Sequence, residues 1–249
     1  MNDEELLRYN RQIMLPQIDV AGQQRLSDAH VVIIGMGGLG SPAAMYLASA
    51  GIGKLTLVDF DRVEISNLQR QLVHRTSDVG KPKVASAREN LLAINPEISI
   101  ETIDEKTDDF MLDKLAQLAD VVVDASDNYE TRFAINRACV EHRTPLVSGA
   151  AIRFEGQVSV FDKRNADSPC YSCLYPEAGE EQETCSENGV LAPIVGIIGS
   201  IQAVETIKLI CNIGDPLVGK LLVFDGLAMQ WRSMNLQCDP QCKVCRKEH

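Results

Sequence analysis

The sequence lacks two features that would place it in a membrane or direct it across one. Apolar runs such as residues 31–34 and 121–123 are far shorter than the roughly 20 residues that a spanning helix needs. The amino terminus, MNDEE, has neither the basic region nor the apolar region of a signal peptide. We therefore expect a cytoplasmic protein with no membrane partner.

An excess of basic residues is also missing. Lys and Arg number 24 against 35 Asp and Glu, which gives a formal net charge of −11. Because affinity for nucleic acid depends on clustered cations, we expect no nucleic-acid partner, although a local basic pocket remains open. The four histidines, His30, His74, His142 and His249, are not grouped in the sequence. No Ser-His-Asp arrangement is evident. We assign them no role.

The chain instead shows alternating predicted strands and helices. Strands are expected at residues 31–34, 55–59, 98–103, 120–124 and 145–148, and helices at 41–50, 83–94, 108–119 and 129–142. This order predicts one α/β domain with a Rossmann-like, doubly wound and mostly parallel sheet. Later strands at 157–161 and 220–224 predict an antiparallel C-terminal extension, and residues 1–27 predict short amphipathic helices.

A glycine-rich loop, GMGGLG at residues 35–40, lies between the first predicted strand and the first helix of the alternating region. Its glycines let backbone N–H groups approach phosphates, and Asp59 follows 19 residues after Gly40, where a carboxylate can accept ribose hydroxyls. On its own this pattern fits NAD as well as ATP, and a glycine turn without a ligand also remains open.

Several cationic residues follow Asp59 closely in the sequence. Residues 59–71 read DFDRVEISNLQRQ, and GKPK at residues 80–83 opens a predicted helix. Hydride transfer has no need for this density of cations, whereas fixed Arg and Lys side chains can stabilise departing pyrophosphate. Taken singly, Arg70 and Lys83 could equally be surface cations.

Two CxxC pairs, 68 residues apart, supply four thiols: Cys170, Cys173, Cys242 and Cys245. Four thiolates complete a tetrahedral structural zinc site and leave no open position for catalysis. Buried or redox-active thiols are the alternative, and Cys238 is a competing ligand. Cys139 and Cys211 lie in helical patterns among apolar neighbours and are expected in the core.

Several of these segments together resemble the MoeB/ThiF family of E1-like (ubiquitin-activating) adenylyltransferases. The resemblance covers nearly the whole chain and rests on RYNRQ at residues 8–12, the glycine loop, residues 59–71, Lys83, and DASDN at residues 124–128. It implies ATP as the nucleotide, Mg²⁺ as its companion ion and structural zinc on the four cysteines.

The resemblance also assigns roles to residues. Asp59 would hold the ribose, Gly38 would contact the phosphates, and Asp127 would be needed for catalysis and would position Mg²⁺. The implied catalytic set is Asp127, Arg70, Lys83 and Arg11, with Arg11 reaching into the neighbouring subunit of a homodimer. The implied nucleotide-binding set is Gly35, Gly37, Gly38, Gly40, Asp59, Asp61, Ser66, Asn67, Leu68, Gln69, Arg70, Lys83, Asp127 and Asn128.

By the same resemblance, a ubiquitin-like sulfur-carrier protein ending in Gly-Gly would be adenylated on its C-terminal carboxylate. Residues 146–153 and 189–193 look closer to the branch that acts on the small subunit of molybdopterin synthase than to the branch that acts on the thiamine-pathway carrier. Residues 28–150 would form the nucleotide-binding half, and residues 151–249 the half that binds the partner and zinc.

Some alternatives stay open. Cys185, in an acidic stretch, matches a cysteine that bonds to the activated partner in some relatives, or it is a spare exposed cysteine. No rhodanese-like sulfurtransferase domain is expected after the last CxxC pair. Two alternatives come from other functional classes: an NAD-dependent oxidoreductase, and a non-catalytic scaffold with a vestigial site.

Overall fold

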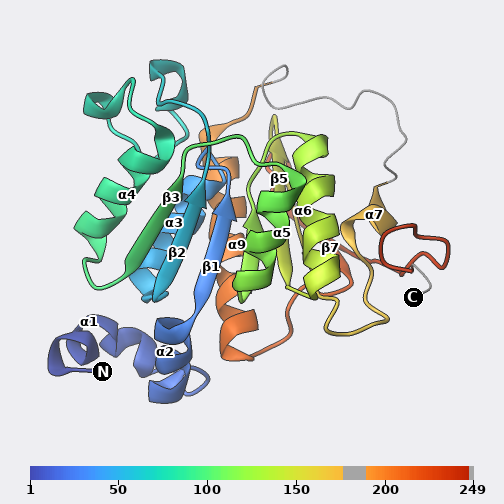
Figure 1. The fold of residues 1–249 in the computed structure, drawn as a ribbon, viewed down its shortest axis with the longest axis horizontal. Helices are drawn as coiled ribbons and strands as arrows, with labels where there is room; N and C mark the ends of the chain where they lie inside the picture. Colours follow the sequence, from blue (N-terminus) through green and yellow to red (C-terminus); the bar gives the residue numbers. More distant parts are fainter. Residues whose placement is uncertain (176–188, 247–249) are drawn as a thin grey trace.

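The computed structural model describes residues 1–175 and 189–246, which build one eight-stranded mixed sheet (Figure 1). The strand order is β3-β2-β1-β4-β5-β6-β7-β8, with β1 to β5 parallel and β6 to β8 antiparallel. The strands are β1 (His30–Ile34), β2 (Lys54–Val58), β3 (Ser99–Ile103), β4 (Val121–Asp124), β5 (Leu146–Ile152), β6 (Glu155–Phe161), β7 (Lys220–Asp225) and β8 (Gln230–Asn235).

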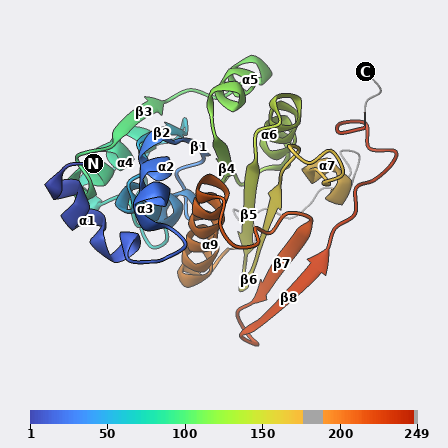
Figure 2. The same ribbon diagram turned by 90° about the horizontal axis from the view of Figure 1, so that it is seen from below.

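Helices cover both faces of the parallel strands. The helices are α1 (Asp3–Ile13), α2 (Asp19–Asp28), α3 (Gly40–Ala50), α4 (Lys83–Ile94), α5 (Asp109–Leu118), α6 (Tyr129–His142), α7 (Tyr171–Leu174) and α9 (Ala192–Cys211), with short 3₁₀ turns η1 (Ile65–Asn67) and η2 (Thr76–Asp78). Helices α3, α4 and α9 pack on one face, and α5, α6 and α7 on the other (Figure 2). The central strands β1 and β4 are nearly all apolar because both of their faces are covered.

The expected fold class is confirmed. The predicted strands and helices lie within a few residues of the observed ones, and the later strands do form an antiparallel extension. The sequence missed β8, which is exposed at all six positions and whose residues, QWRSMN, do not alternate between apolar and polar. An edge strand that buries neither face leaves little trace in a hydropathy pattern.

Helix α9 corrects one step of the sequence argument. Among residues 1–175 and 189–246, it is the one helix long and apolar enough to cross a membrane, with a mean hydropathy of 1.7 over its best window. Short apolar runs did not reveal it because Gly, Ser and Gln interrupt its apolar residues. In the fold, 56% of that window is buried, mainly against α3, β5 and β6, so α9 is a core helix of this sheet.

The strand order places the loops after β1 and β4 next to each other. The chain leaves β1 towards β2 on one side, while β4 lies on the other side of β1, which makes their carboxyl ends the switch point of the sheet. Contact here is tight, since a Cβ atom on Gly35 would lie only 2.6 Å from the carbonyl oxygen of Ala125. Ligands of doubly wound folds bind at such a point.

Candidate nucleotide site and metal centre

The glycine loop closes on itself between β1 and α3. Gly35 has a φ of 95°, and its N–H donates to Val58 at the end of β2 over 2.8 Å. A Cβ atom on Gly40 would lie 1.8 Å from the carbonyl oxygen of Gly35, so no larger residue fits there without moving the backbone. Gly37 and Gly38 are half-buried between these two positions. The loop therefore carries backbone N–H groups to the start of a helix, as an anion site requires.

Asp59 directly follows β2 and is tied to the glycine loop. One carboxylate oxygen accepts a hydrogen bond from the Met36 N–H at 2.7 Å, and the other accepts from the Asp61 N–H at 2.9 Å. Burial raises the pKa of Asp59, and the nearby Lys83 ammonium opposes that rise. Lys83 Nζ lies 3.9 Å from Asp59 and 2.7 Å from Asp61. The structure thus brings the loop, both carboxylates and Lys83 together.

The segment between Asp61 and Lys83 folds into two short turns. In the first, η1, the Arg70 guanidinium donates to the Ser66 carbonyl oxygen at 3.2 Å, and Asn67 Nδ2 lies 3.4 Å from Ser66 Oγ. Leu68 and Gln69 continue this turn and carry partly or fully exposed side chains. Arg70 and Asn67 are thus held by contacts within this segment.

Asp127 and Asn128 follow β4. Asn128 caps helix α6, because its side chain accepts from the Thr131 N–H at 2.9 Å. The exposed Asp127 lines a cavity of about 150 Å³ together with Arg132 of α6 and residues of β5, β6 and β7. Asp127 therefore stands between the switch point and a hollow that opens towards the antiparallel extension.

Arg132 is a buried cation that the sequence analysis missed. Its Nη2 donates to the Ser126 carbonyl oxygen at 2.7 Å, while its buried Nε has no hydrogen-bond partner within the described part of the chain. An arginine in an amphipathic helical pattern resembles an exposed cation, and only the packing of α6 on the sheet reveals it at the wall of the cavity.

Arg11 does not join the other predicted residues within one chain. It is exposed in the last turn of α1, and this helix contacts the C-terminal end of α4, where Arg8 donates to the Ile94 carbonyl oxygen at 3.2 Å. Lys83 begins α4, and a helix of this length separates its ends by roughly 17 Å. The structure of a single chain thus places Arg11 far from the glycine loop.

The two CxxC pairs meet as expected. Their four Sγ atoms lie within 4.8 Å of one another. Three of the separations are 3.9 Å for Cys170 and Cys173, 3.7 Å for Cys170 and Cys242, and 3.5 Å for Cys173 and Cys245. Four thiolates at about 2.3 Å from a tetrahedral Zn²⁺ stand about 3.8 Å apart, so the geometry fits that ion.

The remaining cysteines divide into three cases. Cys238 Sγ lies 3.8 Å from Cys245 Sγ, beside the cluster, so it remains a neighbouring thiol. Cys139 and Cys211 are buried in the core, as the sequence predicted. Cys185 lies outside the described residues.

Comparison with known proteins identifies the family. The model of the ThiF family matches residues 9–244, which is most of the chain. The chain belongs to the ThiF family. This confirms the family expected from the sequence.

Two bacterial relatives are similar over almost their whole length. The chain is 49% identical over 245 residues to the molybdopterin-synthase adenylyltransferase of Escherichia coli K12, covering 98% of both chains. It is 45% identical over 246 residues to the sulfur carrier protein ThiS adenylyltransferase of the same organism, covering 98% of this chain and 97% of that one. The expected enzyme class, an E1-like adenylyltransferase, is thereby confirmed.

A solved structure agrees on the fold. The crystal structure of E. coli MccB with ATP superposes with a TM-score of 0.84 at 28% identity, over 96% of this chain and 75% of that one. That protein shares the ThiF-type arrangement of the sheet and was crystallised with the nucleotide expected here.

Proposed function

We propose that this ThiF-family adenylyltransferase uses ATP to adenylate the C-terminal glycine carboxylate of the ubiquitin-like small subunit of molybdopterin synthase. The products are an acyl-adenylate and pyrophosphate, and the reaction serves molybdenum cofactor biosynthesis. The observation that carries the proposal is the 49% identity with the E. coli molybdopterin-synthase adenylyltransferase along 98% of both chains. The clustering of the glycine loop, Asp59 and Lys83 at the switch point supports it.

ATP would bind across the ends of β1 and β2. Asp59 accepts the ribose hydroxyls, and the loop containing Gly35, Gly37, Gly38 and Gly40 presents N–H groups to the phosphates. Residues of the segment after β2, together with Asn128 after β4, complete the proposed site: Asp61, Ser66, Asn67, Leu68, Gln69, Arg70, Lys83 and Asn128. The pairing of Lys83 with Asp61 at 2.7 Å supports this role, because that pairing holds the lysine beside the loop.

The chemistry needs positioning and charge stabilisation. The carrier carboxylate is already ionised at neutral pH, so it attacks the α-phosphate without a general base, and the bond to the β-phosphate breaks. Arg70 and Lys83 stabilise the negative charge that grows on the departing pyrophosphate. Asp127 positions the reacting groups, and its exposed carboxylate fits Mg²⁺, which prefers one or two carboxylates together with phosphate oxygens. The ion would neutralise phosphate charge.

The cavity beside Asp127 is the proposed entry for the carrier's Gly-Gly tail. It is bounded by β5, β6 and β7, and its volume of about 150 Å³ suits a chain without side chains. The buried Arg132 at its wall supplies a positive charge near the incoming carboxylate. Residues 151–249 are accordingly proposed as the half that binds the carrier, and residues 28–150 as the nucleotide half, with residues 1–27 packed at their base.

Several further features belong to the same proposal. The four clustered cysteines hold a structural zinc ion. The protein is a cytoplasmic homodimer, in which Arg11 reaches the site of the neighbouring subunit. The position of Arg11 away from the glycine loop of its own chain supports that arrangement. Cys185 is the proposed site of covalent attachment of the activated carrier.

Adenylation of a thiamine-pathway sulfur carrier is the second candidate. The 45% identity with the ThiS adenylyltransferase of E. coli favours it almost equally. ATP–pyrophosphate exchange, measured with Mg²⁺ and each carrier in turn, distinguishes the two candidates. Exchange with the molybdopterin-synthase subunit alone supports the proposal, and exchange with the thiamine carrier alone replaces it with the second candidate.

The role of Asp127 is tested in the same assay. Asp127→Ala is expected to abolish exchange while largely sparing ATP binding in calorimetry, whereas Arg70→Ala is expected to weaken both. Glu97→Ala is a matched control, because it removes an exposed carboxylate at the amino end of β3, away from the site. Exchange at the wild-type rate in Asp127→Ala would contradict the proposed role of Asp127 in positioning the reacting groups.

A further inference from the structure

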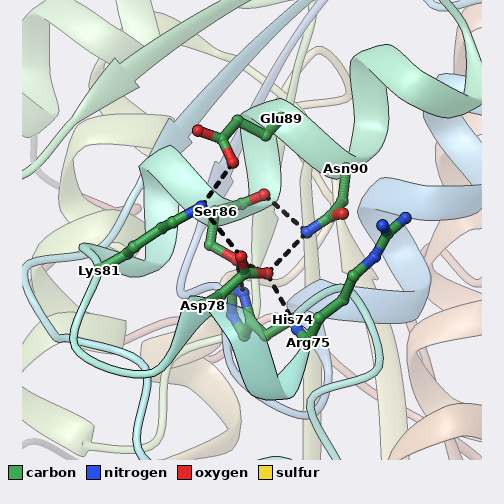
Figure 3. Close-up of polar contacts among 7 residues, drawn as sticks. All are labelled: His74, Arg75, Asp78, Lys81, Ser86, Glu89 and Asn90. Carbon is green, nitrogen blue, oxygen red and sulfur yellow. Dashed lines mark hydrogen bonds and ion pairs between the residues drawn. The ribbon is translucent and has the colours of Figure 1, made fainter.

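A polar network fills the space between η2 and helix α4 (Figure 3). His74 lies at its inner end, with only 6% of its surface exposed. Its Nε2 is 3.1 Å from the carbonyl oxygen of Met36 in the glycine loop, and its Nδ1 is 2.9 Å from Ser86 Oγ on α4. One buried ring therefore joins the glycine loop to α4.

Asp78 holds the outer end of the network. Its carboxylate accepts hydrogen bonds from the Arg75 N–H at 3.0 Å, from Ser86 Oγ at 2.9 Å and from Asn90 Nδ2 at 3.0 Å, and Lys81 Nζ lies 3.1 Å away. Burial alone would raise the pKa of Asp78, but the hydrogen bonds from Lys81 and the other donors outweigh it and lower the pKa well below its usual value. The carboxylate thus stays charged and fixes the turn to α4.

The network connects to the nucleotide site through Met36. The backbone of Met36 is held on both sides, since its N–H donates to Asp59 and its carbonyl oxygen faces His74. Asp59 also lies 3.9 Å from Lys83, and Lys83 stands three residues before Ser86 on the same helix. The contacts therefore form a closed circuit through the loop, the ribose carboxylate and the start of α4.

The chemistry of the circuit defines the tautomer of His74. The Met36 carbonyl oxygen can only accept a hydrogen bond, so Nε2 of His74 carries a proton. Burial, the largest effect, and the nearby Lys83 lower the pKa of His74. They outweigh the hydrogen bond to the Met36 carbonyl and the attraction of Asp59 and Asp78, so the neutral ring is favoured. In that form Nδ1 can only accept a hydrogen bond, and the Ser86 hydroxyl, which has one proton, donates either to Asp78 or to Nδ1.

We propose that His74 is a positioning residue for adenylate formation, which holds the Met36 carbonyl and Ser86 so that the glycine loop and Lys83 keep a fixed spacing before ATP arrives. This inference rests on the proposed function, in which the phosphates of ATP lie between those two elements. A site that is already in place loses no binding energy to rearrangement, and small displacements of phosphate-binding groups are costly. His74 itself touches neither substrate.

Two substitutions separate the two contacts of the ring. In His74→Gln, the amide nitrogen lies near the place of Nε2 and can still donate to Met36. In His74→Asn, the amide lies near Nδ1 and can reach only Ser86. We expect His74→Asn to raise the KM for ATP about tenfold, the size expected when a buried carbonyl loses its donor. His74→Gln is expected to raise it no more than about threefold, with the KM for the carrier unchanged in both.

A second pair of variants covers the case in which His74→Asn fails to fold. Ser86→Ala removes the other partner of the ring and is expected to raise the KM for ATP about threefold. Ser77→Ala, an exposed serine of η2, is the matched control and should leave it unchanged. Melting temperatures are measured alongside, because a purely structural role would lower them without changing the KM of the folded enzyme.

The outcomes distinguish a failure of the proposed adenylation activity from a failure of the proposed role of His74. Wild-type protein without ATP–pyrophosphate exchange with either carrier overturns the proposed function and this inference with it. Normal wild-type exchange, with the same KM for ATP in His74→Gln, His74→Asn and Ser86→Ala, overturns the role of His74 alone. A rise in KM with His74→Asn that His74→Gln largely rescues supports it.

Discussion

The parallel and antiparallel parts of the sheet are stabilised by different means. Four of the five residues of β1 are buried, and the loop after β1 packs so closely that a Cβ on Gly40 would meet the Gly35 carbonyl oxygen at 1.8 Å. Strand β8, in contrast, is exposed at all six positions. The segment that follows β8 contributes Cys242 and Cys245 to the cluster of four thiols. Close backbone packing governs one part, and the four-thiol cluster, where we propose a structural metal ion, governs the other, so different perturbations should break them.

The largest effect is expected from a methyl group in the parallel part. Gly40→Ala must displace the glycine loop, because the contact with the Gly35 carbonyl oxygen leaves no space. We expect ATP–pyrophosphate exchange to fall by about 100-fold or more, since misplacing reactive groups by about 1 Å has effects of that size.

A matched substitution in α9 serves as the control. Gly196→Ala adds the same methyl group where, apart from its chain neighbours and its own helix backbone, no atom of the described residues lies within 4 Å, so exchange should stay at the wild-type level. Its melting temperature should rise slightly, because alanine lowers the conformational entropy of the unfolded chain. Unchanged exchange in Gly40→Ala would show that the tight loop is dispensable.

Removal of the metal should act mainly on the other part. A strong chelator would remove the proposed metal ion that the four thiolates share, and we expect the melting temperature of the protein as purified to fall by roughly 10 °C. Hydrogen exchange should speed up first in α7 and residues 237–246, while β1 stays protected.

The competing thiol provides the control for that experiment. Cys170→Ser should release the metal, whereas Cys238→Ser should retain it, because Cys238 stands beside the four-thiol cluster. Loss of metal from Cys238→Ser would instead make Cys238 a ligand. An unchanged melting temperature after verified metal removal would contradict the structural role.

The smallest expected effect is a loss of stability at low pH, which arises from His74 in the parallel part. Burial lowers the pKa of His74 below its ordinary value of 6.5, so the unfolded chain takes up a proton before the folded one does. Stability should therefore fall as the pH drops from about 6.5 towards the lowered pKa. The slope from this residue is at most that of one proton, about 1.4 kcal/mol per pH unit.

Urea unfolding at pH 7.5 and 5.5 measures this slope. His74→Gln should reduce the difference between the two pH values, since glutamine does not titrate. His30→Gln is an informative companion, because burial also lowers the pKa of His30 at the opposite end of the strands. An identical pH dependence in wild type and His74→Gln would contradict the assignment. Asp78 affects stability at lower pH than His74 does. Its lowered pKa stabilises the fold above about pH 4, and this contribution is lost in stronger acid.

Much of the parallel part could be predicted from the sequence because its signals are local. Runs such as VVII and VVV mark strands covered on both faces, and the glycine loop falls between a strand and a helix. The grouping of Asp59 with Lys83 follows from the same topology. The four cysteines were predictable as a group because two CxxC pairs supply the four thiolates of a tetrahedral zinc site, and the family resemblance implied zinc on them.

What the sequence could not show depends on contacts between distant segments. His74 stands alone among the histidines and appears isolated, yet the fold places it 3.1 Å from a carbonyl 38 residues earlier. Arg132 resembles a surface cation until α6 packs on the sheet. Strand β8 buries neither face, so hydropathy does not mark it.

Helix α9 bears on how this protein is made. It comes after β5 and β6 in the chain, yet it packs on α3, β4 and β5, and Ala203 and Cys211 belong to the same core cluster as β1. A ribosome would therefore release every parallel strand before the helix that covers one of their faces. The nascent chain must keep an apolar surface exposed over about 40 residues of further synthesis, or roughly 2 to 8 s. Protection by a chaperone should matter most in that interval.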